Sequence, residues 1–185
     1  KMKYVVKENF LQRLVIYDKK YMNALKKIVK SIAQIDVIKS NAKTSIRNNY
    51  SKPIIKEHSP EKNSFLDIKQ LRHPIIEKIQ SELEYVPNDI TLGLETSGML
   101  LYGTNASGKS SFMKSIGLNL IMAQAGMYVA AKKMVFYPYH YLFTRIRNND
   151  NLFRGQSSFA VEMSELRAIL KRADAKSVVL GDELC

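Results

Sequence analysis

Eight consecutive residues near the middle of the chain have the types and spacing of a phosphate-binding loop. A glycine is followed by four free positions and then by Gly-Lys-Ser; the residues are Gly103, Thr104, Asn105, Ala106, Ser107, Gly108, Lys109 and Ser110. Glycines let a backbone wrap closely around phosphate, and the N–H groups at the start of a following helix point at negative charge. We therefore expect Lys109 to reach the β- and γ-phosphates of a nucleotide and the Ser110 hydroxyl to ligate Mg²⁺.

The flanking residues provide the context that such a loop requires. The apolar run Met99–Tyr102 predicts a buried strand before the loop, and the apolar periodicity of Lys109–Ala125, closed by Gly126, predicts a helix after it. The alternative to a nucleotide-binding site is a glycine-rich turn that merely closes a strand–helix unit and binds no ligand.

A second group with catalytic potential follows an apolar run near the end of the chain. Val178–Leu180 predicts a strand, and Asp182 and Glu183 come directly after it. Asp182 would hold the magnesium shell, and Glu183 would orient or deprotonate the attacking water. Alone, this pattern is more often a strand that leaves the core into an acidic loop, but a phosphate-binding loop upstream favours the catalytic interpretation.

Paired serines precede another predicted helix, at Phe159–Ala173. Ser157 and Ser158, after Gly155, offer hydroxyls and free N–H groups where an anion can bind. Spacing alone favours an ordinary helix cap at this position.

Strands and helices alternate over the C-terminal two thirds of the chain, which predicts a layered α/β domain at 64–185. The further strands expected there are Phe65–Ile68, Thr91–Leu94, Met134–Tyr137 and Tyr141–Ile146.

The N-terminal part has a different pattern. Apolar residues recur at steps of three and four from Leu11 to Ile35, and no Gly or Pro interrupts Phe10–Tyr50, so we expect one long helix that acts as a strut. We assign 1–50 to this helical segment and the Pro-containing stretch 51–63 to a linker. The lysine-rich outer face of the helix is either simply solvated or contacts nucleic acid. Charge alone favours a solvated face.

Composition narrows the class of protein. The chain has 185 residues, a net charge of +12 and one cysteine, Cys185. Residues 1–50 hold 12 basic and 3 acidic side chains, so most of the excess lies there. A single cysteine excludes an internal disulfide framework, and the longest charge-free run, Ser115–Ala131, contains polar residues and glycines. We expect a soluble intracellular protein, with nucleus, cytoplasm, organelle and virus left open.

Taken together, these segments resemble the MutS family of DNA mismatch-repair ATPases. The resemblance rests on the order and spacing of several motifs beside the loop: "LRHPIIE" (71–77), "EYVPNDI" (84–90), "AQAGMYVAA" (123–131), "FTRI" (143–146), "DNLFRGQSSFAVEMSE" (150–165) and "VVLGDE" (178–183). "IAQIDVIKSNA" (32–42) is similar to the end of the lever helices that precede the family's ATPase domain.

The resemblance implies an ABC-ATPase-like P-loop domain with Lys109 and Glu183 as catalytic residues and ATP and Mg²⁺ as ligands. It also implies a homo- or heterodimeric clamp on mismatched DNA. Tyr85 would stack on adenine, and Ser157 and Ser158 would approach the ATP of the partner subunit.

The chain departs from the family at Thr104-Asn105-Ala106 and at Ser111, and we expect all four residues to belong to the nucleotide-binding site all the same. These departures bear on the subgroup more than on ATP binding. The segment "GDELC" (181–185) indicates an organellar or large-virus-like branch. We expect a fragment that ends at the Asp-Glu pair and hydrolyses ATP poorly by itself. The alternatives are a MutS-related ATPase that acts on recombination junctions or stalled ribosomes, a chromosome-maintenance or transporter-like ATPase, and a non-enzymatic ATP-binding module.

Overall fold

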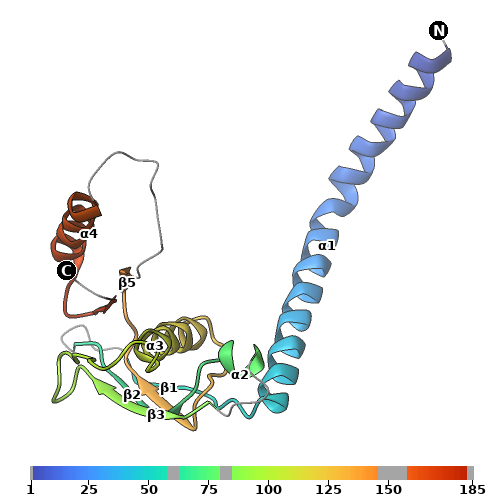
Figure 1. Ribbon diagram of the computed structural model, residues 1–185. Helices are drawn as coiled ribbons and strands as arrows, with labels where there is room; N and C mark the ends of the chain where they lie inside the picture. The colour runs from blue at the N-terminus through green and yellow to red at the C-terminus, as the bar shows by residue number, and fades with distance from the viewer. Residues whose placement is uncertain (1, 58–62, 80–84, 146–157, 183–185) are drawn as a thin grey trace. The chain divides into compact units, whose positions relative to one another are not determined.

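The computed structural model describes residues 2–57, 63–79, 85–145 and 158–182, without the side chains of 158–161, and it divides into two units, Lys1–Thr44 and Ser45–Cys185. The first unit consists of a single helix, α1 (Met2–Arg47), which continues into the start of the second (Figure 1). Its apolar stripe is exposed within this unit.

The prediction of one long helix is confirmed, with shifted ends. The helix begins at Met2 instead of Phe10, because no Gly or Pro interrupts the first residues either. It ends before Tyr50 because Asn49 adopts a left-handed conformation (φ 51°) and the N–H of Tyr50 donates to the carbonyl of Ser45 over 2.9 Å. Asparagine tolerates this conformation at a helix end better than most residues.

The second unit alternates strands and helices, as expected for an α/β domain. Its elements are β1 (Ile54–Ile55), β2 (Leu66–Leu71), α2 (Ile76–Ile79), β3 (Asn88–Leu92), α3 (Lys109–Gln124), β4 (Lys133–Phe136), β5 (Tyr141–Arg145), α4 (Ser158–Arg172) and β6 (Ser177–Gly181). Four strands form a sheet in the order β1-β4-β2-β3, and β5 and β6 form a separate parallel pair. The strands expected at 134–137 and 141–146 are thus confirmed, but they belong to different sheets.

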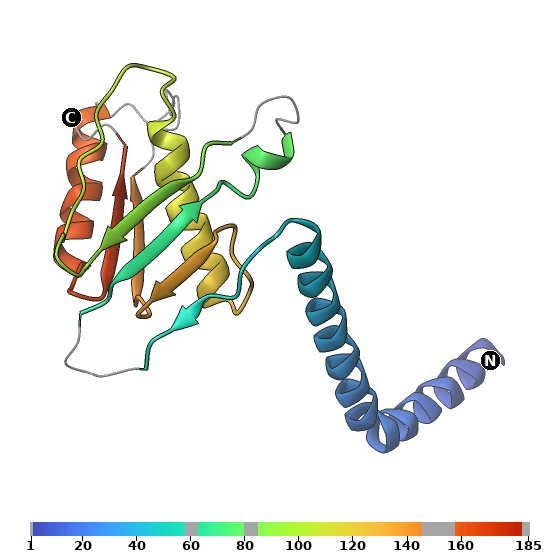
Figure 2. The same ribbon diagram turned by 90° about the horizontal axis from the view of Figure 1, so that it is seen from below.

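The core lies between α3 and these sheets. Leu66, Ile68, Met134 and Phe136 alternate along β2 and β4 and are fully buried in one apolar cluster with α3. The helix covers one face of the four-stranded sheet (Figures 1 and 2).

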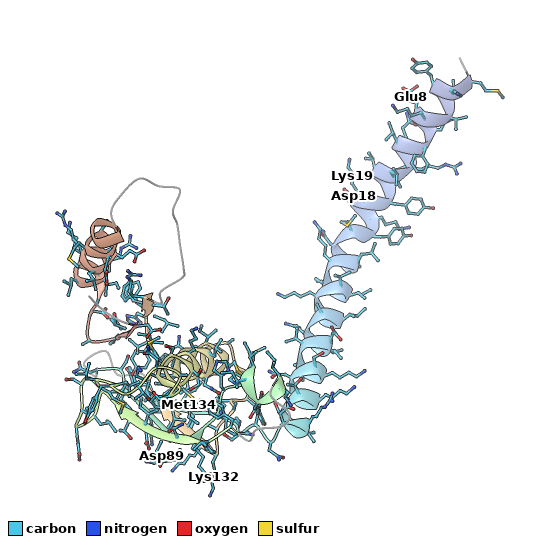
Figure 3. All side chains as sticks on the ribbon, in the orientation of Figure 1. Glu8, Asp18, Lys19, Asp89, Lys132 and Met134 are labelled. Carbon is cyan, nitrogen blue, oxygen red and sulfur yellow. The ribbon has the colours of Figure 1, made fainter. Side chains whose placement is uncertain are left out.

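The opposite face of this sheet is charged. Figure 3 shows Met134 among the side chains between the sheet and α3, whereas Asp89 and Lys132 lie on the other side. Successive side chains along a strand point to opposite faces, so the register of β3 that buries Ile90 exposes Asp89. Lys132 lies just before β4.

The parallel pair shares the same core. Val178 and Leu180 of β6 join the apolar cluster, and α3 approaches Leu180 at Gly117, where an added Cβ would lie 2.8 Å from Leu180 Cδ1. Glycine at this position therefore allows close packing between the helix and β6.

Two predictions about this unit are wrong. Ile54 and Ile55 fall in the expected linker but pair in parallel with β4, so part of 51–63 is a sheet edge. Met99–Tyr102 is not a buried strand: Leu100 and Tyr102 are 87% and 91% exposed. A strand requires a hydrogen-bonded neighbour, and no described strand pairs with this segment.

Within the described residues, no helix has both the length and the apolar character needed to cross a membrane.

Candidate nucleotide-binding site

The predicted phosphate-binding loop lies directly before α3. Residues 103–108 are all exposed, and Lys109 is the first residue of the helix. Gly108 caps the helix in a left-handed conformation (φ 93°, ψ 6°) without a side-chain hydrogen bond. The first N–H groups of α3 are therefore not capped by a side chain and face the loop, which suits an anionic ligand.

Lys109 is folded back over this loop. Its Nζ donates hydrogen bonds to the carbonyl oxygens of Gly103 and Thr104 at 2.7 and 2.8 Å. A phosphate oxygen would offer the same ammonium group a charged acceptor, and charge-assisted hydrogen bonds are stronger than bonds to neutral carbonyls. Ser110 and Ser111 follow on the first turn of α3, each partly buried.

Lys109 and Asp182 line the same cavity. The cavity has a volume of about 870 Å³, and its walls include Phe112 and Met113 of α3 and Leu180 of β6. Of the eight residues of the predicted loop, Lys109 is the one that lines this cavity, and it meets the end of β6 there. This juxtaposition is the one that binding and hydrolysis of a nucleoside triphosphate require.

The position of Asp182 follows from strand pairing. β6 runs parallel to β5 in a register that places Gly181 beside Arg145, and the N–H of Asp182 donates to the carbonyl of Arg145 over 2.7 Å. Asp182 consequently lies at the carboxyl end of a parallel pair, where ligands bind in α/β proteins.

The donor set suits magnesium. A serine hydroxyl and a carboxylate are oxygen ligands, which Mg²⁺ prefers, and it commonly takes only one or two protein ligands beside phosphate and water. Among the described residues, no three His, Cys, Asp or Glu side chains gather into a metal cluster. The chemistry of Ser110 and Asp182 therefore fits an ion that phosphate helps to hold, although Ser110 does not itself line the cavity that Asp182 lines.

Tyr85 lies elsewhere in the second unit. Its ring centroid is 6.4 Å from that of His73, and the tyrosine is partly buried, which raises its pKa. It is not among the residues that line the 870 Å³ cavity. Its stacking on adenine stays a prediction.

The remaining predicted site residues are only partly described. Ser158 is the first residue of α4, while Ser157 and Glu183 lie outside the described residues. Their roles stay predictions.

The structure adds two residues that the sequence analysis did not single out. Arg145 forms ion pairs with Glu162 and Glu165 on α4, and Asn119 is a fully buried amide on α3. The only signal for Arg145 was its place in "FTRI"; Asn119 stood out as a polar residue in an apolar helix.

The arrangement of alternating strands and helices around α3 defines a mixed α/β protein with a loop suited to phosphate. Residues 99–185 match the family model of MutS domain V. The chain is 40% identical to the mitochondrial DNA mismatch repair protein mutS homolog of Sarcophyton glaucum, over 97% of this chain and 18% of that protein.

Two further proteins with DNA mismatch repair in their names are similar to this chain. A putative DNA mismatch repair protein mutS homolog of Acanthamoeba polyphaga mimivirus is 35% identical over 100% of this chain and 20% of its own length. The DNA mismatch repair protein MutS of Streptococcus pyogenes serotype M18 is 40% identical over 89% of this chain and 19% of its own length. The chain belongs to the MutS family, and it spans about a fifth of the length of these curated relatives.

Proposed function

We propose that this chain binds and hydrolyses Mg-ATP as part of a DNA mismatch-repair protein, and that ATP binding is coupled to clamping and release of DNA. The cavity that Lys109 and Asp182 share is the observation that carries the proposal. The names of the three relatives, all DNA mismatch-repair proteins, support the biological setting.

Each residue of the site has a distinct part in the proposed reaction. Lys109 and the N–H groups at the start of α3 hold the phosphates, and Ser110 and Asp182 hold the cation. Bound magnesium neutralises charge that develops on the phosphates. Glu183, directly after Asp182, orients or deprotonates the water that attacks the γ-phosphate.

Coupling to DNA involves a second copy or a related subunit. In the proposed dimer, the segment that carries Ser157 and Ser158 approaches the ATP of the partner subunit, and Tyr85 holds adenine. The basic helix α1 acts as a lever between the ATP site and bound DNA. Its excess of positive charge would favour a polyanion by general electrostatics.

The P-loop assignment is tested by replacing Lys109 with Ala in the full-length protein and titrating a fluorescent ATP analogue. Loss of the charge-assisted contacts should weaken ATP binding by about tenfold to a hundredfold, since such bonds contribute roughly 1.5–3 kcal/mol. The control is Lys132→Ala, because Lys132 is also exposed but does not line the cavity. Undiminished affinity of the Lys109 variant would refute the assignment.

The DNA coupling is tested by measuring steady-state ATP turnover with heteroduplex DNA, with matched duplex and without DNA. Turnover that changes with heteroduplex supports the mismatch-repair proposal. ATP turnover that does not change with DNA contradicts the coupling. ATP binding is tested separately by the Lys109→Ala variant.

A further inference from the structure

Arg145 occupies a junction between three elements. It is the last residue of β5, and its backbone carbonyl accepts the hydrogen bond from Asp182 at the end of β6. Its side chain reaches α4, where Nη2 lies 3.6 Å from Glu162 Oε2 and Nε lies 3.0 Å from Glu165 Oε2. One residue therefore links both parallel strands to this helix.

The two carboxylates belong to one face of α4, since residues three positions apart are neighbours on a helix surface. Their surroundings differ: the Glu162 side chain is 7% exposed, and that of Glu165 is 50% exposed. Arg145 itself is 16% exposed. A buried carboxylate needs a charged partner, and Arg145 supplies one to Glu162.

Arg145 contacts the fifth and eighth of the fifteen residues of α4. Ser158 opens the helix and lies one turn before Glu162, on the segment proposed above to approach a partner's ATP. The helix that begins at Ser158 is thus joined to Asp182 through Arg145, by one contact of its backbone and others of its side chain.

Resting on the proposed ATPase function, we propose that Arg145 is a positioning residue for hydrolysis: it holds the start of α4 in register with the metal-binding end of β6. Arg145 does not line the cavity and need not contact ATP. Its loss should therefore lower kcat and leave the affinity for ATP nearly unchanged. Small misplacements of catalytic groups reduce rates strongly. The pair with the half-exposed Glu165 adds little to stability, but loss of Arg145 also leaves the buried carboxylate of Glu162 without this partner, which lowers stability.

The test compares variants of the full-length protein by kcat, KM for ATP, binding of a fluorescent ATP analogue and the midpoint of thermal unfolding. Arg145→Ala should lower kcat by about tenfold or more, with analogue binding within about twofold and a lower midpoint of thermal unfolding, because the buried carboxylate of Glu162 loses this partner. Arg145→Lys keeps the positive charge but lacks the planar guanidinium group. Its kcat should lie between those of the wild type and Arg145→Ala. The matched control is Arg167→Ala, an exposed arginine on the same helix.

A double-mutant cycle with Glu162→Gln separates positioning from a general loss of structure. If the two residues act as a pair, Arg145→Ala combined with Glu162→Gln should be no slower than Arg145→Ala alone, because coupled residues are non-additive. Should Arg145→Ala fail to fold, Arg145→Lys and Glu162→Gln form the same cycle with milder changes.

Unchanged kcat in Arg145→Ala, fully additive effects in the cycle, or a loss of ATP binding equal to the loss of kcat would each overturn the proposal. These outcomes differ from failure of the proposed function, which would appear as undiminished ATP binding in the Lys109→Ala variant.

Discussion

The side-chain oxygen of Asn119 accepts a hydrogen bond from the backbone N–H of Ala130 over 2.6 Å, in a fully buried position. The amide nitrogen of the same residue donates to the carbonyl oxygens of Arg72 and Ser115 at 3.0 and 2.8 Å. The helix that begins at Lys109 is therefore fastened through one side chain to the end of β2 and to the segment before β4.

Replacing Asn119 with Leu should destabilise the second unit by about 2–4 kcal/mol, because the N–H of Ala130 and the carbonyl of Arg72 would remain buried without this partner. Urea unfolding followed by tyrosine fluorescence measures the effect, since the chain has ten tyrosines and no tryptophan. Lys114→Ala, at an exposed position of the same helix, is the control and should change stability by less than about 0.5 kcal/mol. Equal effects of both substitutions would contradict the assigned role of Asn119.

Glu183→Gln should separate binding from turnover. Glutamine keeps the size of the side chain but cannot accept a proton, so ATP turnover should fall by about a hundredfold to ten-thousandfold. Binding of a fluorescent ATP analogue should stay close to that of the unmodified protein. Phosphate release and analogue titration provide the two measurements, and turnover at the original rate would remove Glu183 as the group that activates water.

Substitution of Gly93 and of Gly126 by alanine allows the loss of stability to be compared between a crowded and an open position. Both have positive φ, 83° and 78°, but a Cβ on Gly93 would lie 2.3 Å from the carbonyl oxygen of Ser64, whereas nothing lies within 4 Å of one on Gly126. Gly126→Ala should cost only the backbone strain, about 1–2 kcal/mol. Gly93→Ala must also displace neighbouring backbone, so we expect a cost of about 3 kcal/mol or more. Denaturant unfolding of the two variants checks the order, and a smaller loss for Gly93→Ala would be inconsistent with this packing.

His73 should make stability depend on pH. Its Nδ1 accepts hydrogen bonds from the N–H groups of Ile75 and Ile76, both at 3.2 Å, and burial lowers its pKa below the ordinary 6.5. The unfolded chain therefore binds a proton at higher pH than the folded chain does. The stabilisation from neutral His73 is fully present above about pH 6.5 and is lost as the pH falls toward the lowered pKa of the folded state.

His73→Asn keeps a side-chain acceptor but does not titrate, so its unfolding free energy should vary less between about pH 7 and 5. The exposed carboxylates of Asp89 and Asp174 have lowered pKa values and stay ionised over this window. Identical pH profiles for the variant and the unmodified chain would exclude His73 as the source.

Local patterns were sufficient for several elements. The helix after the loop was expected at 109–125 and is found at Lys109–Gln124, and the strand expected at 178–180 is found at Ser177–Gly181. Apolar periodicity, glycine positions and capping are properties of neighbouring residues, so the sequence carries them directly. The same reasoning failed at Met99–Tyr102, whose apolar character does not specify a pairing partner, and at Ile54–Ile55, which is too short to produce a pattern.

The sequence by itself determined the motif predicted to bind phosphate, the carboxylate after β6 and the long uninterrupted helix, because each depends on residue types at short spacing. Only the tertiary structure decided that Lys109 and Asp182 share one cavity, that Asn119 joins three segments and that Arg145 links β5 and β6 to α4. These contacts join residues far apart in the chain. They depend on strand register and on the packing of α3 against the sheets, which no short stretch of sequence specifies.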